Sequence, residues 1–199
     1  EKVNFVRELA QLSARNRSGS WVSWPLVETI QKDGVCAEVH SPASNANYEL
    51  ASSIAKTIAE GLDVTGVLAV ELFETAQGEL LVNELAMRPH NSGHFSIEGS
   101  VTSQFEQHLR AVLDLPLGDP SMTARNVVMG NILGGEKEDM YRPYLHLMAR
   151  NPDLKFHHYR KEVKPGRKIG HINALGDHLV ELRADVEHAL AYMSGEIDE

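Results

Sequence analysis

Two short apolar segments joined by a tight turn constrain the fold of this chain more than any other feature. Val67–Phe73 is apolar except for Glu71, and Leu80–Leu85 is apolar except for Asn83 and Glu84. The polar, glycine-containing turn between them is typical of a β-hairpin. A hairpin closed at this turn places Glu71 and Glu84 at roughly opposing positions, about 5–8 Å apart if they share a face.

The hairpin residues indicate a site for a hard divalent cation. Two carboxylates and the amide oxygen of Asn83 are the kind of ligand that Mg²⁺ prefers. Glu71 and Glu84 both lie among apolar neighbours, and a charge embedded in a buried strand is costly unless something compensates it. Spacing alone leaves a second interpretation open, in which these are two solvated strand glutamates.

The segment that follows the hairpin is rich in groups that bind anions and transfer protons. Arg88–His94 contains an arginine, two histidines, an asparagine and a serine. A guanidinium group binds anions through its fixed fork of donors, and imidazole exchanges protons near neutral pH. The pattern indicates a substrate-binding loop, while an ordinary polar loop remains an equal alternative.

A basic turn near the end of the chain reverses the local charge. Tyr159–His171 carries five cations and one acid in a chain of net charge −9. This reversal favours a bound anion, most simply a phosphate. A solvated basic turn is the alternative, and the segment lacks the interleaved aromatic side chains of a nucleic-acid track.

Length, charge and cysteine content exclude several classes of protein. With 199 residues, the chain is one domain or two small ones. Its acidic balance argues against nucleic-acid binding, and its longest apolar runs fall far short of the ~20 residues that span a bilayer. Cys36 is the single cysteine, so no internal disulfide can form, and we expect a cytoplasmic protein.

Hydrophobic periodicity and turn residues predict an α+β organisation. Leu115–Pro120 is rich in proline and glycine and breaks the periodicity, so we divide the chain into domains 1–118 and 119–199. Helices are predicted over 48–62, 102–113, 141–148 and about 184–193, and the later strands over 126–133, 155–159 and from 169 onward.

The motifs resemble a known family when they are taken together. Gly66–Phe73 and Val82–His94 resemble the ATP-grasp core of purine biosynthesis enzymes. The His-Asn-Ser-Gly-His ending resembles the N5-carboxyaminoimidazole ribonucleotide synthetases, the ATPase subunits of phosphoribosylaminoimidazole carboxylase, in particular. Ser103–Ala111 and Lys161–His171 resemble the same family, so the likeness extends over residues 1 to about 173.

This resemblance implies a fold and a reaction. The fold would be the large lobe of an ATP-grasp domain followed by a small β-rich C-terminal domain. ATP, with Mg²⁺, would phosphorylate bicarbonate to carboxyphosphate, which then carboxylates the amine of 5-aminoimidazole ribonucleotide. We expect no nucleic-acid or membrane partner, and a homodimer at full length.

The resemblance also implies a role for each matching residue. The Mg²⁺ ligands would be Glu71 and Glu84, and the nucleotide would contact Glu1, Lys2, Glu8 and Asn83. The catalytic loop would use Arg88, His90 and Asn91, and the substrate would bind Arg88, His90, Ser92, Lys161, Arg167 and Lys168. For one substrate to use all of them, the basic turn should fold back towards the Glu71 and Glu84 strands.

The family's N-terminal nucleotide-fold domain and its small lobe with a glycine-rich loop have no counterpart in this sequence. The chain starts without Met at about the adenine hinge, so we expect a C-terminal fragment that is inactive alone. Two alternatives stay open. One is a formate-dependent ATP-grasp transformylase acting on glycinamide ribonucleotide, against which His94 argues. The other is a non-catalytic module that only binds a ribonucleotide.

Overall fold

The computed structural model describes residues 2–32, 34–135 and 139–198. These residues fall into two compact units. Unit 1 comprises those within 1–30 and 39–124, and unit 2 comprises those within 31–38 and 125–199. The division between residues 118 and 119 stays a prediction.

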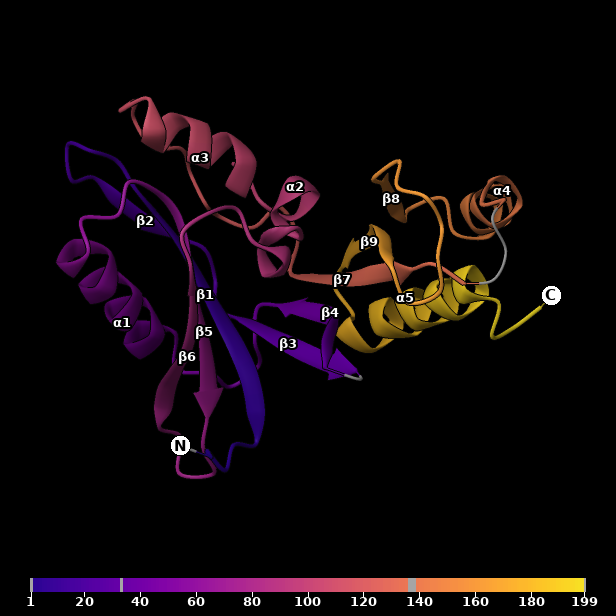
Figure 1. Cartoon of the computed structure of the whole chain (residues 1–199), viewed down its shortest axis with the longest axis horizontal. Helices are drawn as coiled ribbons and strands as arrows, with labels where there is room; N and C mark the ends of the chain where they lie inside the picture. Colours follow the sequence, from indigo (N-terminus) through magenta and orange to yellow (C-terminus); the bar gives the residue numbers. More distant parts are fainter. Residues whose placement is uncertain (1, 33, 136–138, 199) are drawn as a thin grey trace. The chain divides into compact units, whose positions relative to one another are not determined.

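Unit 1 is built on an antiparallel sheet in which β1 is central. Along the sheet, β6 pairs with β5, β5 with β1, and β1 with β3, while β2 pairs with the far end of β1 (Figure 1). Its strands are β1 (Arg7–Arg15), β2 (Trp21–Ser23), β5 (Gly66–Glu74) and β6 (Leu80–Ala86). Strands β3 (Val27–Lys32) and β4 (Val35–Ser41) are divided between the units, because residues 31–38 belong to unit 2. The hairpin expected from the two apolar segments is therefore confirmed as β5 and β6.

Helix α1 (Tyr48–Gly61) covers one face of this sheet and is capped by Asn47, whose side chain accepts from the Leu50 N–H. The sequence places apolar residues at four-residue spacing from Leu50, which predicts that they form the packing face. The structure buries three alanines, Ala51, Ala55 and Ala59, with Ile54 and Ile58 partly buried against the same cluster, and it leaves Leu50 exposed. Small side chains let the helix backbone approach the sheet closely, so the larger residues lie beside the contact.

The alternation of side chains along β5 decides which face carries Glu71. Leu68, Val70 and Leu72 belong to the same buried cluster as the alanines of α1. Because successive residues of a strand point to opposite faces, Glu71 lies on the other face. After β6 the chain continues into the 3₁₀ turn Asn91–Gly93, α2 (Ser96–Gly99) and α3 (Gln104–Val112). Helix α3 contacts β5, where the Val67 N–H donates to His108 Nδ1.

The Ser103 side chain caps α3 by accepting from the Glu106 N–H. Ser103 and Glu106 stand at capping-box spacing in the sequence, a pattern typical of a helix start, and the structure begins α3 there.

Unit 2 contains antiparallel strands and two helices. Strand β9 pairs with β7 on one side and β8 on the other. The elements are β7 (Asn126–Leu133), α4 (Tyr141–Arg150), β8 (Lys155–His158), β9 (Lys168–Gly176) and α5 (Leu179–Ser194). The predicted strands and helices are confirmed, but α5 begins at Leu179 rather than near 184. Leu179 and Leu182 pack against the core cluster of this unit, and this packing extends the helix to Leu179.

Within the described part of the chain, no helix is both long enough and apolar enough to cross a bilayer.

Candidate active site

Glu71 and Glu84 are direct cross-strand partners in the β5–β6 hairpin, as the sequence predicted. The register shifts at the next position, because Leu72 pairs with Val82 and Asn83 is passed over. Such a bulge breaks the strict alternation of side chains and re-aims those beside it. Asn83 and Glu84 are therefore consecutive at a local distortion of β6, and Glu71 lies opposite Glu84 on β5.

The two carboxylates differ in burial, which corrects part of the sequence argument. The Glu71 side chain is 27% exposed, whereas Glu84 and most of β6 are exposed. The expectation that both charges are embedded in buried strands is therefore wrong for Glu84. Its apolar neighbours Val82 and Leu85 are themselves exposed, because among the described strands β6 is last in the order, with β5 as its neighbour.

Glu8 joins this pair from β1. Ala10 is the direct partner of Glu71 and Glu8 lies two residues before it on the same strand, so both side chains share the face of Glu71. The pKa of Glu71 is raised above its usual value, chiefly because burial disfavours the charged form, and further because Glu84 and Glu8 repel it. The Arg88 guanidinium acts in the opposite direction.

This arrangement fits a divalent cation whose remaining ligands come from elsewhere. Carboxylates gathered on one face, with a raised Glu71 pKa, are a concentration of negative charge that a cation relieves. Among the described residues, no group of three or more His, Cys, Asp or Glu side chains lies close enough to hold a metal ion. Mg²⁺ is ordinarily held by one or two carboxylates together with substrate phosphates and water, so Glu71 and Glu84 suit that ion.

The loop after β6 brings an imidazole to this carboxylate face. His90 Nε2 lies 3.6 Å from Glu71 Oε1, and His90 Nδ1 lies 2.8 Å from the hydroxyl of Ser92. Ser92 is buried and Asn91 half-buried, while the Arg88 side chain is exposed and donates to the Pro89 carbonyl. The structure therefore brings His90 of the predicted loop next to Glu71, one of the two predicted metal ligands.

Sequence reasoning missed the residue that holds this loop. Gln104, fully buried at the start of α3, accepts from the His90 N–H at 2.8 Å and donates to the His90 carbonyl at 2.8 Å. It also contacts His94 Nδ1 at 3.0 Å. Only the capping signal of Ser103 marks this helix start in the sequence, and nothing local reports that the next side chain turns inward.

The remaining predicted nucleotide contacts lie near the start of the chain. Lys2 is exposed in the segment before β1. Glu1 lies outside the described residues, so its predicted role stays a prediction.

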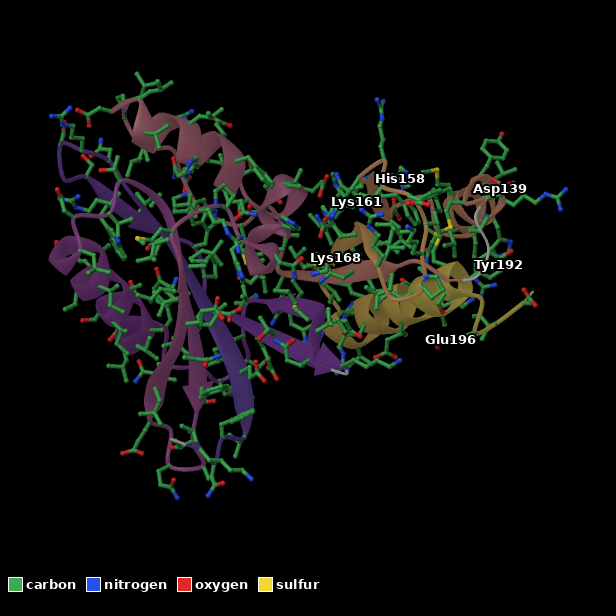
Figure 2. All side chains as sticks on the ribbon, in the orientation of Figure 1. Asp139, His158, Lys161, Lys168, Tyr192 and Glu196 are labelled. Atoms are coloured by element: carbon green, nitrogen blue, oxygen red, sulfur yellow. The ribbon has the colours of Figure 1, made fainter. Side chains whose placement is uncertain are left out.

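The basic turn lies in unit 2, between β8 and β9, and Figure 2 shows its labelled Lys161 and Lys168 side chains. The pKa of Lys168, which is half-buried, is lowered by burial and also by the neighbouring charge of Lys161. The Lys161 ammonium lies 5.3 Å from the centre of the Tyr159 ring. Arg167 is held by Glu162, the one acid of the segment, at 3.8 Å. Lys161 thus lies close enough to Lys168 to lower its pKa, as expected of two cations placed around an anion.

Two family models match this chain. Residues 1–105 match the ATP-grasp domain, and residues 127–185 match the phosphoribosylaminoimidazole carboxylase C-terminal domain. The chain belongs to the ATP-grasp family. Within it, the chain is 50% identical over 200 residues to the N5-carboxyaminoimidazole ribonucleotide synthase of Mycobacterium tuberculosis, a match that covers 98% of this chain and 47% of the relative.

Solved structures agree with this placement. The N5-carboxyaminoimidazole ribonucleotide synthetase of Thermus thermophilus superposes with a TM-score of 0.83 at 40% identity, covering 100% of this chain and 52% of that one. The synthase of Aspergillus clavatus, in complex with ADP and 5-aminoimidazole ribonucleotide, gives 0.88 at 33% identity, covering 98% and 53%. The chain therefore spans about half the length of the relatives it matches.

Proposed function

We propose that the protein represented by this chain uses ATP and bicarbonate to carboxylate 5-aminoimidazole ribonucleotide. The γ-phosphoryl group of ATP passes to a bicarbonate oxygen, which gives ADP and carboxyphosphate. The amine then attacks the carbonyl carbon and phosphate leaves. The observation that carries the proposal is the His90 imidazole held 3.6 Å from Glu71, because it joins a cation-binding carboxylate to an anion-binding loop.

In this proposal, Glu71 and Glu84 hold Mg²⁺ with help from Asn83, and Lys2 and Glu8 contact the nucleotide. When bound, the cation neutralises the phosphate oxygens between which the phosphoryl group moves. The raised pKa of Glu71 supports this role, since the site is short of positive charge.

Arg88, His90, Asn91 and Ser92 orient bicarbonate and the aminoimidazole in the same proposal. The Arg88 guanidinium suits the anion through its fork of donors. The His90 ring is fixed on one side by Ser92, so its other nitrogen is aimed at a defined place. Reacting groups fixed in this way have lost their freedom before the reaction starts, which lowers its barrier.

Lys161, Arg167 and Lys168 bind the phosphate of the ribonucleotide in this proposal, remote from the reacting amine. An anion there offsets the repulsion between Lys161 and Lys168 and the cost of burying Lys168. Binding energy from such a remote group positions the reacting end of a substrate.

The activity is tested on the chain alone and on a chimera that joins it to the part of the Mycobacterium tuberculosis relative that it does not match. We expect ADP release that requires both bicarbonate and 5-aminoimidazole ribonucleotide, from the chimera only. Turnover with formate and glycinamide ribonucleotide instead would identify the transformylase alternative. Turnover by the 199 residues alone would contradict the expectation that they are inactive by themselves.

Calorimetry with 5-aminoimidazole ribonucleotide tests the phosphate site separately in the chimera. Arg167→Ala should weaken binding by about 1.5–3 kcal/mol, the range for a lost charge-assisted contact. Lys155→Ala is the matched control, because Lys155 is an exposed cation on β8 of the same unit. Equal effects of the two substitutions would refute the phosphate site.

We propose in addition that the full-length protein is a cytoplasmic homodimer. The single cysteine supports a reducing compartment. Sedimentation equilibrium of the chimera tests the oligomeric state, and a monomer would contradict this part of the proposal.

A further inference from the structure

His94 belongs to the polar loop after β6, but none of the roles above uses it. Its Nδ1 lies 3.0 Å from Nε2 of the buried Gln104. Its ring stacks on Phe105 at 5.7 Å between centres with the planes 22° apart. An imidazole held on one nitrogen and one face has a defined orientation, so the identity of the protonated nitrogen becomes a structural property of the loop.

The orientation of the Gln104 amide follows from backbone groups whose roles cannot change. The His90 N–H can only donate, so the atom it contacts at 2.8 Å is Oε1. The His90 carbonyl can only accept, so the atom that contacts it at 2.8 Å is Nε2. These two bonds close a ring between one side chain and one residue of the main chain.

The third contact of Gln104 then settles the state of His94. An amide nitrogen is a donor of two hydrogens and not an acceptor. One hydrogen goes to the His90 carbonyl, and the second goes to His94 Nδ1. Nδ1 must therefore accept, so His94 is neutral and carries its proton on Nε2 while this contact is made.

The surrounding loop leaves little room for the amide to reorient. The Ser96 hydroxyl donates to the Gly93 carbonyl at 2.6 Å and accepts from the Gln104 N–H at 2.9 Å. A Cβ atom added at Gly93 would meet the Gln104 amide oxygen and the Leu12 side chain. Gln104 is thus fixed at its backbone and its side chain.

We propose that Gln104 is a positioning residue that holds His94 in its Nε2–H tautomer and fixes the main chain of His90 beside Glu71. One buried amide thereby sets both ends of the loop, through the backbone at His90 and through the ring at His94. The structural part of this inference stands by itself, and its catalytic consequence rests on the proposed function.

The tautomer is tested first, by ¹⁵N NMR of the histidine rings of the 199-residue chain at pH 8. We expect an acceptor-type signal from His94 Nδ1 and a protonated-type signal from Nε2. Gln104→Glu removes both donors, since a carboxylate can only accept, so Nδ1 must then carry a proton. A protonated Nδ1 in the unsubstituted chain would overturn the proposal, as would an unchanged signature in a folded Gln104→Glu variant.

Gln107→Glu is the matched control. Gln107 is also fully buried on α3 and also clamps one main-chain residue, accepting from the Gly118 N–H at 2.7 Å and donating to its carbonyl at 2.8 Å. The two substitutions should destabilise the chain similarly, which melting temperatures report. Gln107→Glu should leave the His94 ¹⁵N signature unchanged. A shift as large as that of Gln104→Glu would overturn the proposal, because it would show that both residues act only by stabilising the fold.

The catalytic consequence is measured in the chimera. Gln104→Glu should lower kcat by about 10–100-fold, the range expected when a reacting group is misplaced by a fraction of an ångström to one ångström, with KM for ATP little changed. Gln107→Glu should leave kcat within about twofold of the parent. Equal losses of kcat would refute the catalytic part. An inactive parent chimera would refute the proposed function, and the NMR result would still decide the tautomer.

Discussion

Replacing Glu71 by glutamine should stabilise the folded chain, although it removes a predicted metal ligand. The pKa of Glu71 is raised by burial and by the charges of Glu84 and Glu8, so the folded state holds this proton to higher pH than the unfolded state does. The free energy of unfolding therefore falls as pH rises from the unfolded-state pKa of Glu71 through its folded-state pKa. Glutamine carries no charge, so Glu71→Gln removes this decline and its benefit is fully present at pH 8.

The magnitude follows from the hairpin register. Directly paired residues have Cβ atoms about 4.5–5.5 Å apart, which places the two carboxylates about 6 Å apart. At that distance, two unit charges repel by about 3 kcal/mol at an effective dielectric constant near 20 and by about 0.7 kcal/mol in water. Because Glu84 is exposed, the lower part of this range applies, and we expect about 0.7–1.5 kcal/mol of stabilisation.

Thermal unfolding at pH 8 without divalent cations measures this effect. A gain near 1 kcal/mol raises Tm by about 2–4 °C in a chain of this size. Glu79→Gln is the control, because Glu79 is an exposed carboxylate in the turn of the same hairpin, and it should leave Tm nearly unchanged. Adding Mg²⁺ with ATP should raise Tm of the parent chimera but not of its Glu71→Gln variant. A lower Tm of Glu71→Gln without cations would refute the electrostatic reasoning.

Three further predictions concern packing and buried hydroxyl groups. Gly93→Ala should lose about 1–3 kcal/mol of stability, because its Cβ has no room among the packed side chains. Gly61→Ala should cost no such stability, because a Cβ atom at Gly61 meets open space. Equal melting temperatures of the Gly93→Ala and Gly61→Ala variants would contradict the packing argument. Burial raises the pKa of Tyr144 and Tyr159 to about 12, so ultraviolet titration of the two Tyr→Phe variants should show that neither ring ionises by pH 10. Tyr159→Phe should also cost about 1–3 kcal/mol, since it strips the buried His171 of a 2.6 Å hydrogen bond, and an unchanged melting temperature would count against that bond.

The sequence by itself determined the features that depend on neighbours along the chain. Two apolar segments and a glycine turn specify the β5–β6 hairpin, and closing it at that turn makes Glu71 and Glu84 partners. The cap of α3 at Ser103 is also readable, because donor and acceptor are three residues apart. The reversal of charge that marks the basic turn is a property of composition alone.

Tertiary structure decided the features that depend on residues distant in the sequence. Glu84 is exposed because β6 is last in the strand order, a position that its apolar neighbours do not reveal. Glu8 reaches Glu71 only because β1 pairs with β5 across about 60 intervening residues. Gln104 closes the loop at His90 and His94 because helix packing turns its side chain inward, and burial of that kind has no local signature. Short-range patterns therefore located the candidate site, and long-range packing set its charge balance and its geometry.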